Sequence, residues 1–453
     1  MNYRSKVRYS KLALGLAIAL ASAPAMAQNT TANIGGRVTA ANEAVIAGAQ
    51  VTITHVPSGT VSQAVTDANG RYAARGLRVG GPYVVTITKD GQTETVENVF
   101  LQLAETTQVN AAIGASAETT LETVEVTADN LGATPFSSTA MGAGTTVTSD
   151  QLESFASIQR SLQDYARLDP RLSQSDKSRS EISAAGQNSR YNSVTIDGVN
   201  TSDSFGLESN NLPTIKQPIS IDAIQEVQVN ISNYDVTQKG YVGANINAVT
   251  KSGTNELRGS LYHVYRNDDF YGENAAGAPF ADITDEKTWG LTLGGPLVKD
   301  RLFFFLSYED FRRGEQAPDF GPIGSGASNI VNITPQQITD VQNIARTTWG
   351  MGIGEPNVPD GIETRVEDIL LKLDWNISDN HRATFRYNKT DQSDVVYPGF
   401  NSSRLSLSSN WYSQGKTFES YVGEWFADWS DVFSTEAKVS YRGYESVPTN
   451  FSR

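Results

Sequence analysis

Long segments in which polar and apolar residues alternate, all after residue 254, constrain the fold of this chain more than any other feature. In "DILLKLDWNIS" the apolar series from Ile369 to Trp375 alternates with a series that contains Lys372, Asp374 and Asn376. Because successive side chains of a strand point to opposite faces, each segment predicts a strand with one apolar and one ionic face. The pattern recurs in "HRATFRYNK", "SYVGEWFADW" and "STEAKVSYRGY".

The length of these segments favours a membrane wall. Strands of soluble proteins are about five or six residues long, whereas a tilted strand that crosses a bilayer needs roughly nine to eleven. Tight turns such as 378–380 alternate with long connections such as 314–362, which is typical of outer-membrane barrels. The aromatic residues Tyr387, Trp429 and Tyr441 are then expected at the membrane interfaces. A soluble sheet with an aromatic core is the alternative.

The first 27 residues have the features of a secretory signal peptide. A basic start is followed by the apolar run "LALGLAIALA" and by Ala25, Met26 and Ala27 ahead of Gln28. This run is too short to span a membrane as a helix. The chain has no cysteine, which excludes disulfides and thiolate sites. Its formal net charge of −14, without a basic cluster, argues against nucleic acid as a partner.

Residues 28–114 alternate short β-prone runs with turn signals, which predicts a small antiparallel β-sandwich. In "TDANGRYAARGLRVGGPYVVTI" a turn at 67–70 precedes Tyr72 and Tyr83, and both aromatic rings are expected in a common core. The pattern resembles the carboxypeptidase regulatory-like domain, which has a transthyretin-like fold and is fused to many exported proteins.

The name of this family suggests a catalytic zinc site of the kind found in peptidases. The three histidines of the chain, His55, His263 and His381, have no Glu or His at metal-ligand spacing. We therefore expect no metal, no cofactor and no enzymatic activity, and we interpret the sandwich as an accessory module.

Residues 131–253 mix helix and strand. One helix is predicted over 149–170, with Ser149 as its N-cap and Pro170 as its stop. The segment "RYNSVTIDGVN" predicts a strand that ends in the hairpin-turn pair Asp197–Gly198. Further on, "SIDAIQEVQVN" predicts a helical turn that leads into a strand, and "GYVGANINAVTKSGTNELRG" predicts another strand with a Gly-rich turn.

The order of these elements resembles the plug domain of TonB-dependent outer-membrane receptors. The phrases that carry the resemblance are "VTIDGVN", "IDAIQEVQV" and "GANINAVTKSG". The family usually has a paired glycine before the Ile-Asn run, whereas here Gly243 is followed by Ala244. The residues of the plug motif that the resemblance implies are Ile196, Asp197, Gly198, Gly243, Asn245, Thr250 and Lys251.

Two later segments extend the resemblance over nearly the whole mature chain. "GSLYHVYRNDDFYG" and "DRLFFFLSYEDFRRG" look like the first and third wall strands of Oar-like receptors, which carry the same N-terminal sandwich. The resemblance implies a mainly β chain with a transthyretin-like sandwich, an α/β plug and an incomplete antiparallel transmembrane β-barrel. Plugged outer-membrane transporters have about 22 strands. Residues 254–453 supply about seven, so we interpret the chain as the N-terminal half of a longer receptor.

A short β-prone run, "LETVEVTADN", lies in the linker 115–130 between the sandwich and the plug. Its flanks are rich in small residues, so the run has no obvious strand to pair with. By its position it resembles the TonB box, and the coupling residues implied are Glu122, Thr123, Val124, Glu125, Val126 and Thr127. TonB is then the partner, because an extended peptide adds to an exposed sheet edge of another protein. An ordinary linker or a last sandwich strand is the alternative.

Two other chemical signals are weak. "NWYSQGKT" is a near match to a phosphate-binding loop, but Asn410 replaces the leading glycine and the run opens a strand. The acids Asp268, Asp269, Glu309 and Asp310 could suggest a cation site, but their spacing lacks a calcium-loop pattern and we expect them to be solvated at the rims of strands.

These features predict a Gram-negative outer-membrane receptor that binds an extracellular nutrient and imports it with energy transmitted through TonB. The sandwich is then expected in the periplasm, and outer-membrane lipids are expected around the wall. Peptides, oligosaccharides and iron chelates are the candidate ligands. The alternative function is that of a structural or adhesive Oar-like protein of the outer membrane.

Overall fold

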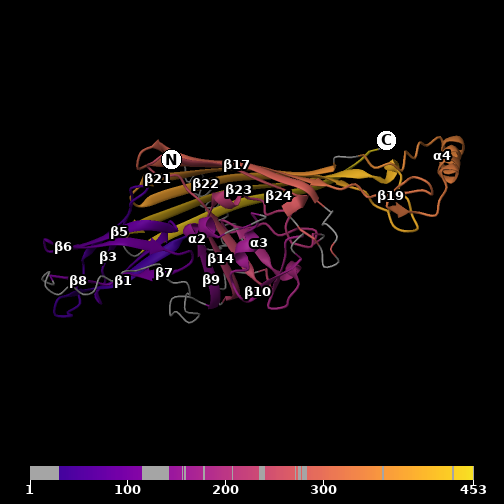
Figure 1. Cartoon of the computed structure of the whole chain (residues 1–453). Coiled ribbons are helices and arrows are strands. Elements are labelled where there is room, and N and C mark those ends of the chain that lie inside the picture. Colours follow the sequence, from indigo (N-terminus) through magenta and orange to yellow (C-terminus); the bar gives the residue numbers. More distant parts are fainter. Residues whose placement is uncertain are drawn as a thin grey trace, which may run out of the picture.

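The computed structural model of the protein describes residues 30–114 and 142–451, except 156, 158–159, 177–178, 207, 234–239, 271, 274–276, 278–282, 360–361 and 431–432 (Figure 1). The predicted signal peptide and the predicted TonB box at 122–127 lie outside the described residues. Within these ranges, no helix is both long and apolar enough to cross a bilayer. The described part is mainly β and consists of three packed units.

The first unit, here the sandwich, spans residues 30–114 and contains two four-stranded sheets. One sheet has the order β4-β1-β7, with β8 also paired to β1; the other has the order β3-β2-β5-β6. The strands are β1 (Ala32–Ala40), β2 (Gln50–His55), β3 (Thr60–Val65), β4 (Arg71–Leu77), β5 (Gly80–Lys89), β6 (Gln92–Leu101), β7 (Thr106–Gln108) and β8 (Ala111–Ile113).

The core and the turn of the sandwich agree with the sequence prediction, but one edge does not. Tyr72 and Tyr83 are both buried in the core, and each hydroxyl donates a 2.8 Å hydrogen bond to a backbone carbonyl. The backbone N–H of Gly70 donates to the carbonyl of Asp67 and closes the predicted turn. The purely antiparallel prediction is wrong, because the chain crosses between the sheets after β6 and then runs parallel to β1 in β7 and β8.

The second unit, here the inner domain, spans residues 142–253 and is built on a five-stranded sheet of order β13-β12-β15-β14-β9. A two-stranded sheet and short helices surround it. Its elements are β9 (Gly142–Thr148), α2 (Ser149–Ser154), α3 (Leu162–Ala166), β10 (Leu172–Asp176), β11 (Glu181–Ala184), η1 (Ser189–Tyr191), β12 (Ser193–Ile196), β13 (Val199–Asn200), η2 (Ile221–Ala223), β14 (Ile224–Asn233) and β15 (Asn245–Thr250).

The single helix predicted over 149–170 is wrong, since the structure has two short helices there. The backbone is extended at Phe155, and the hydroxyl of Ser161 accepts a hydrogen bond from Gln163 N–H and caps the second helix. Serine side chains compete with the helical backbone for hydrogen bonds in this way, so they favour helix starts over helix interiors. The N-cap of the first helix is Thr148, one residue before the predicted Ser149.

The third unit, here the wall sheet, contains seven strands that pair only with their neighbours in sequence, always antiparallel. The strands are β16 (Arg258–Asn267), β17 (Ile283–Val298), β18 (Leu302–Glu315), β21 (Ile362–Ser378), β22 (His381–Val396), β23 (Tyr412–Ser430) and β24 (Phe433–Asn450). The remaining elements lie in the long connections: η3 (Asp268–Phe270), β19 (Phe320–Gly321), β20 (Asn329–Ile330), α4 (Pro335–Trp349) and η4 (Ser408–Asn410).

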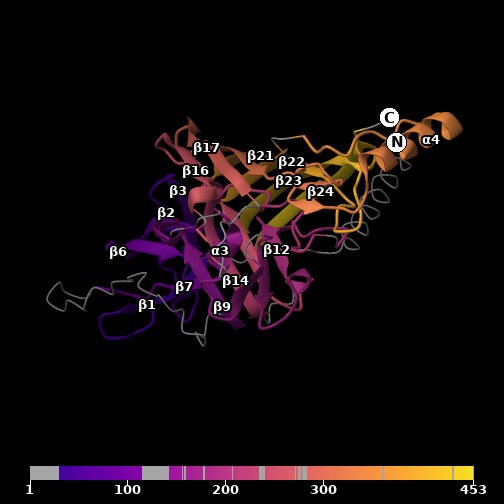
Figure 2. The same cartoon turned by 45° about the vertical axis from the view of Figure 1, so that its right-hand side comes forward.

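Short and long connections of the wall sheet lie at opposite ends of its strands. The inner domain lies against one face of the sheet, the sandwich lies near the end with the short connections, and α4 lies far beyond the other end (Figures 1 and 2). The wall strands that follow β16 have 14 to 19 residues, more than the nine to eleven expected. They are longer because they continue past the apolar band toward the long connections. Tyr387 and Tyr441 therefore lie within their strands rather than near strand ends.

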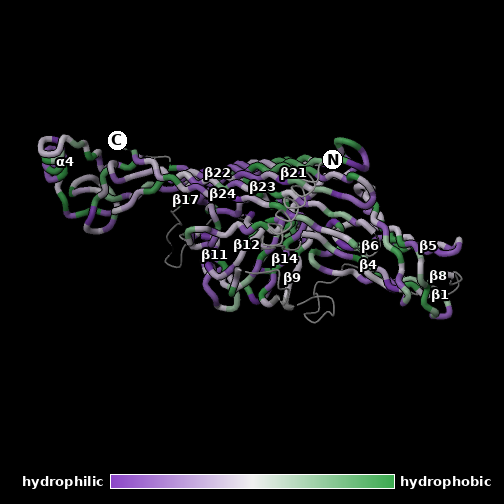
Figure 3. The backbone as a smooth tube through the Cα atoms, turned by 180° about the vertical axis from the view of Figure 1, so that it is seen from behind, coloured by the Kyte–Doolittle hydropathy of each residue, from purple (hydrophilic) through white to green (hydrophobic). Residues whose placement is uncertain are grey.

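Hydrophilic and hydrophobic residues alternate along the strands of the wall sheet (Figure 3), and the exposure of their side chains shows that the two faces differ in chemistry as this alternation predicts. Toward the inner domain, polar and charged side chains are buried: Lys372 is 9% exposed, Asp374 is 1% exposed and Arg386 is 2% exposed. On the opposite face, Trp375 is 51% exposed and Val439 is 78% exposed. The apolar residues exposed on this outer face include Leu261, Leu293, Ile369, Ile377, Phe385, Tyr421, Trp425, Trp429 and Tyr441.

Candidate functional site

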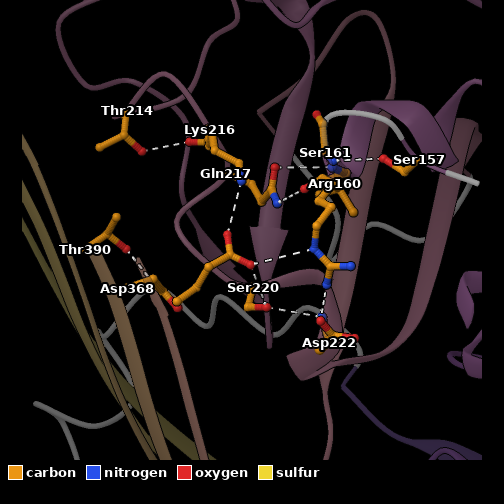
Figure 4. A network of polar contacts seen from close by, with 12 residues as sticks. Ser157, Arg160, Ser161, Thr214, Lys216, Gln217, Ser220, Asp222, Asp368 and Thr390 are labelled. Carbon is orange, nitrogen blue, oxygen red and sulfur yellow. Dashed lines mark hydrogen bonds and ion pairs between the residues drawn. The ribbon is translucent and has the colours of Figure 1, made fainter. Parts of the chain in front are cut away.

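The candidate site is the polar interface between the inner domain and the wall sheet, and its centre is the Glu309 carboxylate on β18. Lys216 of the inner domain contacts one carboxylate oxygen at 3.1 Å. The other oxygen accepts hydrogen bonds from the hydroxyls of Tyr262 at 2.6 Å and Ser220 at 3.1 Å. Figure 4 shows how side chains from both units converge on this network. A buried carboxylate is stable only with such partners, so the network fixes the inner domain against the wall.

Arg160 extends the Glu309 network into the loop between the two short helices. Its Nε lies 4.0 Å from Glu309 Oε2, and its guanidinium forms an ion pair with Asp222. The guanidinium also lies 4.2 Å from the centre of the Tyr262 ring. Nearby, the Lys216 ammonium lies 4.4 Å from the Phe311 ring. Both cations are therefore held by charges and by aromatic faces, which suits groups removed from bulk water.

The prediction that four acids lie solvated at strand rims is wrong for Glu309. Asp268 and Asp269 are exposed in η3, as expected. Glu309 is 5% exposed and faces the inner domain, whereas its neighbour Asp310 faces outward and pairs with Arg312 and Arg365. Adjacent residues of a strand point to opposite faces, so a cluster in sequence is divided between two environments.

A second group of contacts surrounds Asp197, one of the predicted plug-motif residues. Its carboxylate accepts hydrogen bonds from the backbone N–H of Thr250 at 2.9 Å and from the Thr250 hydroxyl at 2.8 Å. Arg386 of the wall sheet lies 3.1 Å away. Burial alone would raise the pKa of Asp197, but the cations Lys372 and Arg386 hold its pKa below the ordinary value. The side chain is therefore an anion that links both units.

The structure brings the predicted plug-motif residues together on β12 and β15, which pair in parallel, and in the segments that adjoin these two strands. Asp197 and Gly198 form the predicted hairpin turn between Ile196 and Val199. Lys251, another motif residue, points away from this turn: its N–H donates to the carbonyl of Ala223, and its side chain pairs with Glu153.

Gly243 and Ala244 lie where the family usually has paired glycines. A β-carbon on Gly243 would lie 2.3 Å from Asn192 Oδ1, so a larger residue would have to displace this side-chain oxygen. Ala244 is fully buried, and its N–H donates to the same Asn192 oxygen at 2.9 Å. The next motif residue, Asn245, is paired opposite Ser193 in the sheet. An alanine at 244 is thus accommodated without a glycine-specific conformation.

Sequence reasoning identified the polar face of the wall but not its partners on the inner domain. Lys216 lies in "NLPTIKQPIS", which has no periodic pattern, and Arg160 lies inside the segment predicted as a continuous helix. Neither position carried a signal that pointed to Glu309. Across the described ranges, no group of three or more His, Asp or Glu side chains is arranged to hold a metal ion.

The sandwich is docked on the inner domain through backbone and side-chain contacts. The carboxylate of Glu226 on β14 accepts a 2.7 Å hydrogen bond from Leu103 N–H of the sandwich. The amide of Gln228 donates to the Leu103 carbonyl at 3.1 Å. Two side chains of the inner domain thus satisfy both backbone groups of one sandwich residue. Val249 of β15 packs into the sandwich core. Docking thus rests on side chain-to-backbone hydrogen bonds and on this apolar contact.

This contact predicts a pH dependence. Burial, with a smaller contribution from the nearby Glu105, raises the pKa of Glu226 from its ordinary value of 4.5 to about 8. Between these values the docked carboxyl holds a proton that the hydrated carboxyl has lost, so docking weakens as the pH rises through this window. The change is about 1.4 kcal/mol per pH unit, and it ends above about pH 8. Thermal unfolding of the sandwich from pH 5 to pH 9 measures it.

Glu226→Gln is the matched variant for this prediction, because the amide keeps an acceptor for Leu103 N–H and cannot ionise. Its stability is expected to be flat across the window. A parent protein whose sandwich stability is constant, or rises, from pH 5 to pH 8 contradicts the prediction.

Comparison with known proteins relates these units to described families. Residues 33–114 match the carboxypeptidase regulatory-like domain, and residues 249–452 match the outer membrane beta barrel domain. The TonB-dependent transporter Oar of Myxococcus xanthus is 25% identical over 353 residues, which are 73% of this chain and 30% of that protein. The chain thus spans about a third of the length of this curated relative.

Two solved structures are similar at low sequence identity. The outer membrane transporter YddB from Escherichia coli has a TM-score of 0.48 and 13% identity, over 68% of this chain and 40% of that one. A mutant of the ferric enterobactin receptor PfeA from Pseudomonas aeruginosa, in complex with enterobactin, has a TM-score of 0.44 and 14% identity, over 67% and 41%.

The two domain families occur here in one chain, in the same order as predicted, and the match to the Oar transporter covers 73% of the chain. The outer membrane beta barrel match identifies the outer membrane as the location of the wall sheet. The outer membrane beta barrel domain, the carboxypeptidase regulatory-like domain and the similarity to the Oar transporter together support a TonB-dependent receptor, of which this chain is a part.

Proposed function

We propose that this chain is part of a transporter that captures an extracellular nutrient and admits it to the periplasm when TonB pulls on residues 122–127. In this proposal residues 254–453 belong to a closed barrel of about 22 strands, residues 131–253 plug it, and residues 28–114 lie in the periplasm. Import needs no covalent chemistry. The observation that carries the proposal is the division of the wall sheet into an apolar outer face and a polar inner face.

The height of the apolar band supports a membrane wall. On β21 the outward side chains from Ile369 to Ile377 are all apolar, and the next outward residues are Glu367 and Arg365. Nine residues extend about 27 Å along a strand. At the usual tilt of barrel strands this length covers roughly 20 Å of membrane depth, which approaches the apolar band of outer-membrane barrels, about 25 Å tall. A soluble sheet has no reason to end its apolar face at a common level.

Two rows of aromatic residues flank this band. Tyr387, Tyr421 and Tyr441 form a ladder across three strands, with ring centres 4.9 and 6.2 Å apart. The hydroxyls of Tyr387 and Tyr421 both donate to Glu419. Trp425 and Trp429 lie toward the short connections. Aromatic residues with one polar atom favour the membrane–water interface, so both rows suit a bilayer boundary.

The polar interface supports a plug that can move. An interface made of ion pairs and hydrogen bonds can be replaced by water when the units separate, whereas a large apolar interface cannot. Glu309 with Lys216, and Asp197 with Arg386, are contacts of this kind. Traction at one end can therefore loosen the inner domain without unfolding the wall.

The position of the sandwich supports a periplasmic orientation. Short turns of outer-membrane barrels face the periplasm and long loops face the exterior. The sandwich lies at the end of the wall sheet with the short connections (Figure 1). The predicted TonB box follows the sandwich in sequence and would be presented on the same side. Residues 122–127 would engage TonB by adding a strand to its sheet, through main-chain hydrogen bonds.

The experiment that tests the proposal uses the full-length receptor with Val126→Pro and Val126→Ile, beside a deletion of 122–127. Proline removes the backbone N–H that strand addition needs, whereas isoleucine keeps it and the β-propensity. We expect Val126→Pro and the deletion to abolish binding of the purified periplasmic domain of TonB, and Val126→Ile to retain it. Titration calorimetry measures binding, and outer-membrane yield shows that insertion is unchanged.

Uptake is measured under the nutrient limitation that induces the gene, with peptides, oligosaccharides and iron chelates as the trial ligands. Loss of uptake in Val126→Pro but not in Val126→Ile supports energised transport. An adhesive or structural protein would instead keep its surface phenotypes in all three variants. Full TonB binding by the deletion variant would sink the assignment of the box.

A further inference from the structure

The sandwich contacts the short-connection end of the wall sheet at several points. Asn376 of β21 donates a 2.9 Å hydrogen bond to the Thr60 hydroxyl, and Arg382 of β22 donates to the carbonyl of Gly76. Thr30 donates to Glu424 of β23 at 3.0 Å. Contacts to three neighbouring strands fix the sandwich across this end of the sheet rather than beside one turn.

Two glycines allow the sandwich to come this close. A β-carbon on Gly76 would lie 2.9 Å from the Phe426 ring, and one on Gly59 would lie 2.4 Å from an Asp300 carboxylate oxygen. Both glycines have positive φ, which other residues rarely adopt. Together with the Glu226–Leu103 contact, they show that the sandwich fits against the wall and against the inner domain at the same time.

A cavity of about 890 Å³ lies where the three units meet. The sandwich contributes His55 and Arg78 to its lining, and Arg78 is 9% exposed and contacts Asp374 at 3.8 Å and the carbonyl of Gly253 at 3.4 Å. The rest of the lining includes Asp197, Lys251, Lys372, Thr384, Arg386 and Glu424. The polar inner face of the wall sheet thus lines one side of this cavity, and the sandwich lines the opposite side.

We propose that the sandwich is a gate at the periplasmic mouth, which must undock before a solute released by the inner domain can leave. The proposal rests on the transport function proposed above. In the docked position the sandwich covers the exit of the cavity, and its polar contacts to the wall are hydrogen bonds and one distant ion pair, which water can replace. The predicted TonB box lies between the sandwich and the inner domain in sequence, so traction there acts on both.

The docking step is tested by the accessibility of the cavity. The 453 residues contain no cysteine, so a Thr384→Cys variant of the receptor carries one reporter thiol in this part of the chain, in the cavity wall. The probe is a maleimide attached to polyethylene glycol, too bulky to pass a docked sandwich. We expect slow labelling of the parent and about tenfold faster labelling when Asn376→Ala and Arg382→Ala are added, because the docked fraction falls.

Arg365→Ala is the matched control, because Arg365 lies on the outer face of the same sheet and pairs there with Asp310. Its labelling rate should equal that of the parent. Labelling with the small reagent N-ethylmaleimide should change little in any variant, which separates undocking from unfolding. If the bulky probe labels the parent and the variant with Asn376→Ala and Arg382→Ala at equal rates, the sandwich does not cover the cavity.

The gating step is tested with a reversible staple. A β-carbon on Gly59 would lie 3.2 Å from Asp300 Cγ, so Gly59→Cys with Asp300→Cys brings two thiols within the reach of a disulfide. The full-length receptor is placed in a planar lipid bilayer with potassium chloride as the permeating probe and enough urea to loosen the inner domain. We expect the oxidised form to conduct about fivefold less than the reduced form, and the Asp300→Cys variant, which keeps Gly59, to conduct as much as the reduced form.

Equal conductance of the oxidised and reduced forms would overturn the gate. This experiment uses neither TonB nor a nutrient, so its failure is distinguishable from a failure of the transport proposal. A receptor that loses uptake in Val126→Pro but conducts equally with the staple closed is a TonB-dependent transporter without this gate.

Discussion

Replacing Glu309 by alanine is expected to destabilise the inner domain against the wall by about 3–5 kcal/mol, the usual cost of removing one partner from a buried ion pair. Lys216 would remain 8% exposed in its side chain without its counter-charge, and Tyr262 and Ser220 would lose their acceptor. The measurement is the urea concentration at which a protease begins to cleave the inner domain of the full-length receptor, while the wall sheet stays folded.

Two variants control this experiment. Glu309→Gln keeps the length of the side chain and an acceptor for Tyr262, so it isolates the effect of the charge. Adding Lys216→Met to Glu309→Ala removes the uncompensated cation and should restore a large part of the loss, as a double-mutant cycle would show. If Glu309→Ala resists urea as the parent does, the network does not hold the inner domain.

Introducing arginine at Leu373 should destabilise the wall sheet in a lipid bilayer by about 2–4 kcal/mol. Leu373 lies near the middle of the outward apolar series of β21, between Leu371 and Trp375. A charge at that depth must lose its hydration or distort the bilayer. The measurement is reversible folding of the full-length receptor into lipid vesicles over a denaturant series.

Ser393→Arg is the matched control for this position. Ser393 is exposed on β22, opposite Arg365 and beyond the apolar band, so an added arginine there should cost about 0–1 kcal/mol. A soluble sheet would tolerate both substitutions to a similar extent, because both side chains would reach water. Equal effects at 373 and 393 would therefore contradict the membrane wall.

The wall sheet was predictable from sequence because its physics is local. A period of two over many residues determines which side chains share a face, and the short turn at 378–380 determines which strands are neighbours. The hairpin turn at Asp197–Gly198 was predictable for the same reason, since both positions need positive φ. The features that sequence predicted correctly are those in which residues a few positions apart determine one another.

The contacts between units were not predictable, because they join residues far apart in sequence and often involve the backbone. Leu103 contributes its N–H and carbonyl to the inner domain, and Gly76 contributes a carbonyl to Arg382. Every residue type offers these groups, so no pattern marks them. Glu309 was misjudged because it was grouped with Asp310, although alternation directs the two side chains to opposite faces of the strand.

The strict period of two also limits how the wall can change in length. Deleting one residue from the middle of β21 would turn Lys372 and Asp374 toward hydrocarbon and bring Leu373 and Trp375 toward the inner domain. Insertions or deletions of odd length are therefore excluded from the strands, whereas the connection 316–361 can lengthen or shorten without disturbing the pairing of the wall strands. Divergence in what such proteins recognise at the cell surface should accordingly concentrate in these connections.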